Sequence, residues 1–76
     1  MEPIKRNDTG AAVEDVQTRL ARIRHLPEDA ITGTFDDATA AALADFLAAS
    51  ALPPSEDVTE KVWAALVDAT YNLGDR

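Results

Sequence analysis

The sequence predicts an all-α fold, in which three helices form a compact orthogonal bundle joined by short turn segments. Two observations lead to this prediction. Three stretches place apolar residues at helical spacing behind a helix-start signal, and prolines or glycines interrupt the chain between them. With 76 residues and no cysteine, the chain is expected to form one domain over residues 1–76, with a core of about 4–71 and no disulfide.

The first helix is expected from about Ala11 to Ile23, with Gly10 at its start. Pro27 prevents the helix from continuing, because proline lacks the backbone N–H and clashes with the preceding turn. Apolar residues recur at i, i+3, i+7 and i+10, which places them on one helical face. They are Val13, Val16, Leu20 and Ile23.

The second helix is expected from about Asp37 to Ser50. Asp36 is a favourable N-cap, because its side chain can accept a hydrogen bond from a first-turn N–H. Pro53 and Pro54 end the helix. Its predicted core face consists of Thr39, Ala42, Leu43 and Phe46.

The third helix is expected from about Glu60 to Tyr71, with Thr59 as its cap and Gly74 as a C-terminal stop. Its predicted core face consists of Val62, Trp63, Leu66 and Thr70. In the turn before the second helix, Gly33 is expected to adopt a positive φ that other residues resist.

A turn–helix unit occurs twice along the chain. Each copy has a Leu-Pro exit, an apolar plug with a capped helix start, and an Ala-Ala-Leu core contact. The first copy comprises Leu26-Pro27, Phe35-Asp36-Asp37 and Ala41-Ala42-Leu43. The second comprises Leu52-Pro53, Val58-Thr59-Glu60 and Ala64-Ala65-Leu66. Such a pair could pack about a pseudo-twofold axis.

The charge and residue types restrict the possible functions. A formal net charge of −7 disfavours a nucleic-acid partner, which requires clustered Lys and Arg. No apolar run approaches the roughly 20 residues of a membrane span, and the N-terminus lacks the apolar region of a signal peptide. His25 is the only histidine, so neither a metal site nor a cofactor is expected. The acidic pairs Asp36-Asp37 and Glu56-Asp57 are explained by helix starts, so no catalytic residue is predicted and the chain is not expected to be an enzyme.

An ordered set of residues covers most of the chain, from position 4 to position 66. It includes Gly10, Val13, Val16-Gln17, Leu20, Thr32-Gly33-Thr34-Phe35, Thr39, Ala42-Leu43, Phe46, Leu52, Val58, Trp63 and Leu66. This order resembles the peptidoglycan-binding-domain-like family. The resemblance implies a three-helix module without chemistry of its own. Such modules accompany cell-wall hydrolases and related secreted or periplasmic proteins, and hold them on murein.

The chain departs from the family pattern at four places. Arg24 stands where the family usually has a glycine at the end of the first helix, and Ala51 replaces a glycine before Leu52. Leu47 replaces a glutamine, and the second turn lacks its glycine within Ser55-Glu56-Asp57. A non-glycine residue in a left-handed helix cap costs about 1 kcal/mol.

The second helix also carries a second apolar stripe, roughly 110° from its core face. The stripe is expected to face solvent with Leu47 projecting from it, beside the end of the first helix. The candidate partner-binding residues are therefore Arg24, His25, Ala40, Ala44, Leu47, Ala48 and Ala51. A second interpretation is that the stripe forms a groove for a glycan or peptide. The third is that alanine is here only as a good helix former and Leu47 extends the core of a slightly rotated helix.

Two functions follow as hypotheses. The first is a non-catalytic module, secreted or associated with the cell wall, that anchors to a peptide or glycan of peptidoglycan. The alternative is a protein-binding module on the same scaffold, natural or engineered, whose second stripe docks a protein partner such as an enzyme that it inhibits. In both, the unbound chain is expected to be a monomer.

Overall fold

The computed structural model describes residues 3–74. Its elements are α1 (Ala11–Arg22), the short 3-10 helix η1 (Glu28–Ala30), α2 (Asp37–Ala49) and α3 (Glu60–Gly74). Within residues 3–74 there is no β-strand, only two isolated bridges. The predicted all-α bundle is confirmed. The sequence did not predict η1, and α3 continues past Tyr71 to end at Gly74.

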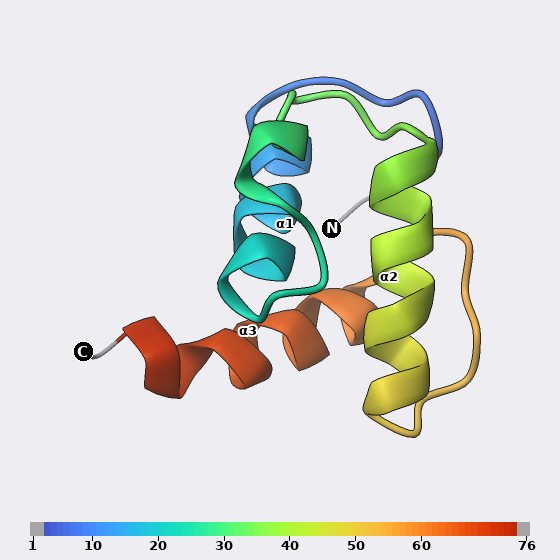
Figure 1. The fold of residues 1–76 in the computed structure, drawn as a ribbon. Coiled ribbons are helices and arrows are strands. Elements are labelled where there is room, and N and C mark those ends of the chain that lie inside the picture. The colour runs from blue at the N-terminus through green and yellow to red at the C-terminus, as the bar shows by residue number, and fades with distance from the viewer. Residues whose placement is uncertain (1–2, 75–76) are drawn as a thin grey trace.

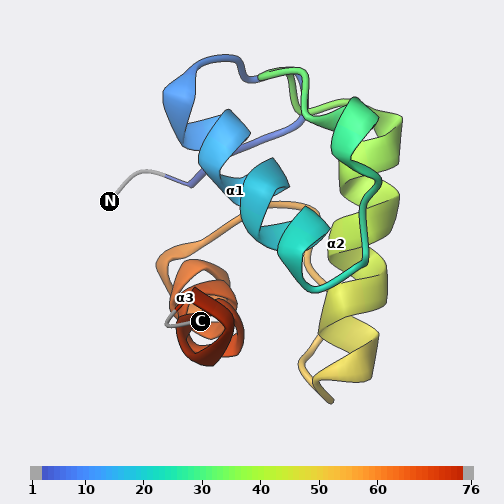
Figure 2. The same cartoon turned by 60° about the vertical axis from the view of Figure 1, so that its left-hand side comes forward.

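Figures 1 and 2 show α1 and α2 side by side, with α3 running across them. The helix α1 packs against both α2 and α3. The predicted faces of α1 and α2 point inward, as required for burial of a single apolar stripe. The core consists of Ile4, Val13, Val16, Leu20, Leu26, Phe35, Ala42, Leu43, Phe46, Leu47, Val58, Val62 and Leu66.

Trp63 lies at the edge of this core rather than within it. Its side chain is partly buried against the core cluster. The guanidinium of Arg19 lies over its ring, 5.1 Å from the centroid, and Arg19 Nη1 donates a 2.7 Å hydrogen bond to Thr70 Oγ1. The sequence placed Trp63 on the core face. The structure shows instead an aromatic side chain that covers the α1–α3 contact and is itself covered by a cation.

The predicted caps of α2 and α3 are present. Asp36 Oδ1 accepts hydrogen bonds from the backbone N of Thr39 at 3.1 Å and from its hydroxyl at 2.9 Å. The bond from the Thr39 backbone N–H has the larger effect on the pKa of Asp36, and the bond from the Thr39 hydroxyl adds to it. Both favour the charged carboxylate and so hold this pKa below its ordinary value. In α3, Thr59 Oγ1 accepts a bond from Val62 N at 3.3 Å. Each helix therefore begins where the sequence predicted.

Both α1 and α2 end in the same hydrogen-bond pattern. After α1, Arg24 N donates to Ala21 O and His25 N donates to Leu20 O, at 3.0 and 2.9 Å. After α2, Ala51 N donates to Ala48 O and Leu52 N donates to Leu47 O, at 3.2 and 2.9 Å. These are Schellman motifs, whose left-handed position usually holds glycine. Here Arg24 and Ala51 occupy it, with φ of 66° and 57°.

The turn before α2 is held by one buried side chain, Gln17 of α1. Its Oε1 accepts hydrogen bonds from the backbone N of Thr32 at 3.0 Å and of Gly33 at 2.8 Å. Its Nε2 donates to Thr34 O at 2.9 Å and to Thr39 Oγ1 at 2.8 Å. Gly33 has a φ of 81°, which confirms the predicted positive value. Gln17 thus fixes the path of the chain into α2.

The segment before α1 joins the two turn–helix units. Ile4 exchanges two backbone hydrogen bonds with Val58, at 3.0 and 2.9 Å. Asn7 N donates to Phe35 O, and Phe35 N donates to Asp8 O, both at 2.9 Å. Figure 1 shows this segment running beside the one that leads into α2. Phe35 and Val58, the apolar plugs of the two repeat units, therefore both bond to this segment, Val58 to one residue and Phe35 to two.

Candidate functional site

Leu47 does not project into solvent, so that part of the second-stripe prediction is wrong. Its side chain is only 1% exposed and belongs to the core cluster. The reason is the turn after α2: the bond from Leu52 N to Leu47 O brings the following residues back along the helix. Leu47 therefore extends the core, as the alternative interpretation of the stripe held.

The other members of the predicted site remain at the surface but do not come together. Ala44, Ala48 and Ala51 are exposed, and Ala40 is partly buried. Arg24 and His25 line a separate shallow hollow at the end of α1, with Ala21 and residues 26–28. The His25 ring meets Phe46 edge-on, with centroids 6.1 Å apart. The structure thus divides the predicted residues between different surfaces.

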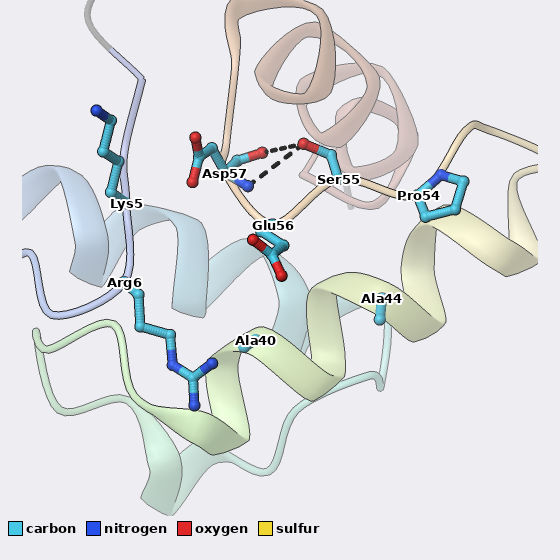
Figure 3. Close-up of a pocket in the computed structure, with 8 residues that line it drawn as sticks. All are labelled: Lys5, Arg6, Ala40, Ala44, Pro54, Ser55, Glu56 and Asp57. Atoms are coloured by element: carbon cyan, nitrogen blue, oxygen red, sulfur yellow. Dashed lines mark hydrogen bonds between the residues drawn. The ribbon is translucent and has the colours of Figure 1, made fainter.

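Ala40 and Ala44 line an open hollow on the surface, which we call the α2 groove (Figure 3). Its volume is about 550 Å³. Three segments form it: the chain before α1, one face of α2, and the loop between α2 and α3. The lining residues are Lys5, Arg6, Ala40, Ala44, Pro54, Ser55, Glu56 and Asp57.

The two sides of the α2 groove carry opposite charges. Arg6 comes from the segment before α1, and Glu56 and Asp57 come from the loop before α3. Figure 3 shows the Arg6 guanidinium and the Glu56 carboxylate both extending toward the part of α2 that carries Ala40. Arg6 also forms an ion pair with Asp37 of the first turn of α2. The methyl groups of Ala40 and Ala44 leave the floor low and free of charge.

Hydrogen bonds hold both sides of the groove in place. In the loop, Ser55 Oγ donates to Asp57 O at 2.8 Å and accepts from Asp57 N at 3.3 Å, which forms a local turn. The adjacent Val58 is bonded twice to Ile4, directly before Lys5. The two charged walls are therefore tied to each other at their base, and the groove is largely preformed.

A smaller apolar cavity adjoins the α2 groove and shares Pro54 and Ser55 with it; we call it the proline hollow. Its volume is about 130 Å³. The other lining residues are Leu47, Leu52, Pro53, Thr59, Lys61 and Val62. Lys61, which is exposed, adds a single positive charge to an otherwise apolar or hydroxyl-bearing lining.

Sequence reasoning missed most of the residues that line the α2 groove. It noted Ser55-Glu56-Asp57 only as a departure from a glycine-containing turn, and it gave Lys5 and Arg6 no role. One signal was available. The repeated apolar plugs at Phe35 and Val58 each needed a backbone partner, and the segment around Ile4 was the remaining extended stretch.

Within residues 3–74, no group of three or more histidine, cysteine, aspartate or glutamate side chains is arranged to hold a metal ion. Over the same residues, none of the helices combines the length and apolar character that crossing a membrane requires.

A small three-helix domain with a preformed open groove has the architecture of a binding module. The family model described as "Putative peptidoglycan binding domain" matches residues 9–66, which is more than half of the chain. The chain belongs to this family, and the resemblance inferred from the sequence is confirmed. No curated protein and no solved structure gave a match.

Proposed function

We propose that this domain binds cell-wall peptidoglycan in the α2 groove and so anchors the protein that carries it. The observation that carries the proposal is the coincidence of family membership with a groove of suitable size. Its volume of about 550 Å³ lies within the range of roughly 300–1,000 Å³ common to ligand pockets. The domain would act as a single non-catalytic unit outside the cell or at the cell wall.

The construction of the groove supports this proposal. Peptidoglycan presents hydroxyls, amides and charged peptide groups, and the walls of the groove offer charged and hydroxyl side chains. Ala40 and Ala44 leave room for a polymer to approach the helix closely. Because hydrogen bonds already fix the loop at Ser55 and the segment at Ile4, binding would order few further residues.

Cosedimentation with purified murein tests the proposal. Ala44→Leu would fill the floor of the groove, and Ala48→Leu is a matched control, one helical turn further along and outside the lining. Wild type and Ala48→Leu are expected to pellet equally, whereas Ala44→Leu loses at least tenfold in affinity. Failure of the wild type to pellet at high micromolar concentration would overturn the proposal.

The protein-docking hypothesis depended on the second stripe of α2. That hypothesis used Leu47 as its apolar anchor, and Leu47 is buried. What remains is an exposed alanine face that includes Ala44, Ala48 and Ala51. Loss of murein binding in Ala48→Leu with retention in Ala44→Leu would place the contact on the part of this face that lies outside the groove.

A further inference from the structure

We infer that the α2 groove recognises the peptide part of murein, through a residue that carries both a free ammonium and a free carboxylate. The inference rests on the proposed function and names the part of the polymer that is bound. A neighbouring small apolar residue would occupy the proline hollow. Diamino-acid side chains next to alanine, as found in murein peptides, have this chemistry, whereas the glycan strand presents mainly hydroxyls and acetamido groups.

The opposed charges of the groove are the first reason. Glu56 and Asp57 form no ion pair within residues 3–74, so their carboxylates can pair with a ligand ammonium. Arg6 is engaged by Asp37, but a guanidinium has five N–H donors and can bind a second carboxylate. Both signs of charge thus face one groove, and a zwitterionic group would complement them at once.

The adjoining hollow is the second reason. It has a volume of about 130 Å³, which suits a small apolar side chain. Leu47, Leu52 and Val62 make its lining apolar. Since it shares Pro54 and Ser55 with the groove, one extended chain can reach both. A sugar ring would gain little from this second cavity.

The position of Lys61 gives the bound peptide a direction. Lys61 lines the proline hollow. A ligand carboxylate next to the small side chain that occupies this hollow would therefore lie near the Lys61 ammonium. A terminal alanine supplies both groups, the methyl for the hollow and the carboxylate for Lys61. The zwitterionic residue would then precede this alanine and lie between Arg6 and Glu56.

Titration of the intact domain with three ligands tests the inference. The ligands are intact murein, glycan strands stripped of peptide, and the soluble peptide L-alanyl-D-isoglutamyl-diaminopimelyl-D-alanine. The peptide is expected to bind, and acetylation of its free ammonium or amidation of the side-chain carboxylate should each lower affinity at least tenfold. Binding of the stripped glycan without binding of the peptide would overturn the inference and leave the proposed function intact. Absence of binding to all three would overturn both.

Matched variants locate the contacts. Glu56→Gln should remove the effect of acetylation, whereas Glu28→Gln, the same change at an exposed site outside the groove, should preserve it. Lys61→Gln should weaken binding of the peptide acid but not of its C-terminal amide, with Arg22→Gln as the charge-matched control. Thermal melts establish that each variant is folded. If acetylation still matters equally in folded Glu56→Gln, the assignment of the ammonium site is wrong.

Discussion

Gln17 Nε2 donates a 2.8 Å hydrogen bond to Thr39 Oγ1, and both residues are fully buried. The hydroxyl in turn donates to Asp36 Oδ1, the cap of α2. One continuous set of hydrogen bonds therefore links the middle of α1 to the first turn of α2. This link positions α2, and with it the floor of the α2 groove, relative to the rest of the domain.

Gln17→Leu should destabilise the domain by about 2–4 kcal/mol. Leucine fills similar space, but the N–H groups of Thr32 and Gly33 lose their acceptor, and an unsatisfied buried donor costs roughly 1–3 kcal/mol. Chemical denaturation measures the loss, and hydrogen exchange should show reduced protection of the Gly33 amide. Thr18→Ala, which removes a hydroxyl bonded only within α1, should change stability by less than about 0.5 kcal/mol. An equal effect of the two changes would contradict this role for Gln17.

Leu47→Asp should unfold most of the protein. Removing a buried leucine costs about 2–5 kcal/mol, and burying a carboxylate adds to this. A domain of this size has only about 3–5 kcal/mol to lose. Circular dichroism measures the loss of helix, and Ala48→Asp at the exposed neighbouring position should retain it. A folded Leu47→Asp variant would restore the idea of an exposed stripe.

Arg24→Gly and Ala51→Gly should each raise stability by about 0.5–1 kcal/mol. Both positions have a left-handed backbone that an L side chain resists, and glycine relieves this at some cost in chain entropy. The two effects should add, because the sites end different helices. Ala41→Gly, at an exposed position within α2, should have the opposite sign. Denaturation midpoints of wild type, the three single variants and the Arg24→Gly/Ala51→Gly double variant test this; a destabilised Ala51→Gly would rule it out.

Asp36→Ala should cost about 1 kcal/mol at neutral pH through loss of the α2 cap. The folded pKa of Asp36 lies below its ordinary value of 3.8, so its contribution is complete above that pH. As pH falls through the lowered folded pKa, the carboxylate is protonated and the gap between wild type and variant should close. Stability curves between pH 2 and 7 measure it, with Asp45→Ala as a control on the exposed side of α2. A gap that persists unchanged at the lowest pH would exclude a charge-dependent cap.

The sequence was sufficient for the helices because their signals are local. Asp36 and Thr59 mark helix starts through bonds to residues three positions away, and periodic apolar residues mark the buried face. The buried face of α2 was harder to predict from the sequence. Alanine on every side of that helix gives little contrast, so only contacts with the following turn reveal that Leu47 faces inward.

The α2 groove could not be predicted in the same way. Its walls include Arg6 and Glu56, which lie far apart in sequence and line one groove because Ile4 pairs with Val58. Such a pairing depends on backbone groups and leaves no side-chain pattern. The second-stripe hypothesis did include Ala40 and Ala44, two of the residues that form the floor, although it grouped them with Leu47 on one exposed face.

The pairing of residues 4–8 has a practical consequence for defining a minimal folding unit. The family match begins at residue 9, after the residues that bond to Val58 and Phe35. A fragment that begins at residue 9 would lose the buried Ile4 side chain and four backbone hydrogen bonds. It would also lose Lys5 and Arg6, which form one wall of the α2 groove. Fusion partners should therefore be joined upstream of Ile4, because a shorter fragment would lose both ligand binding and much of its cooperative folding.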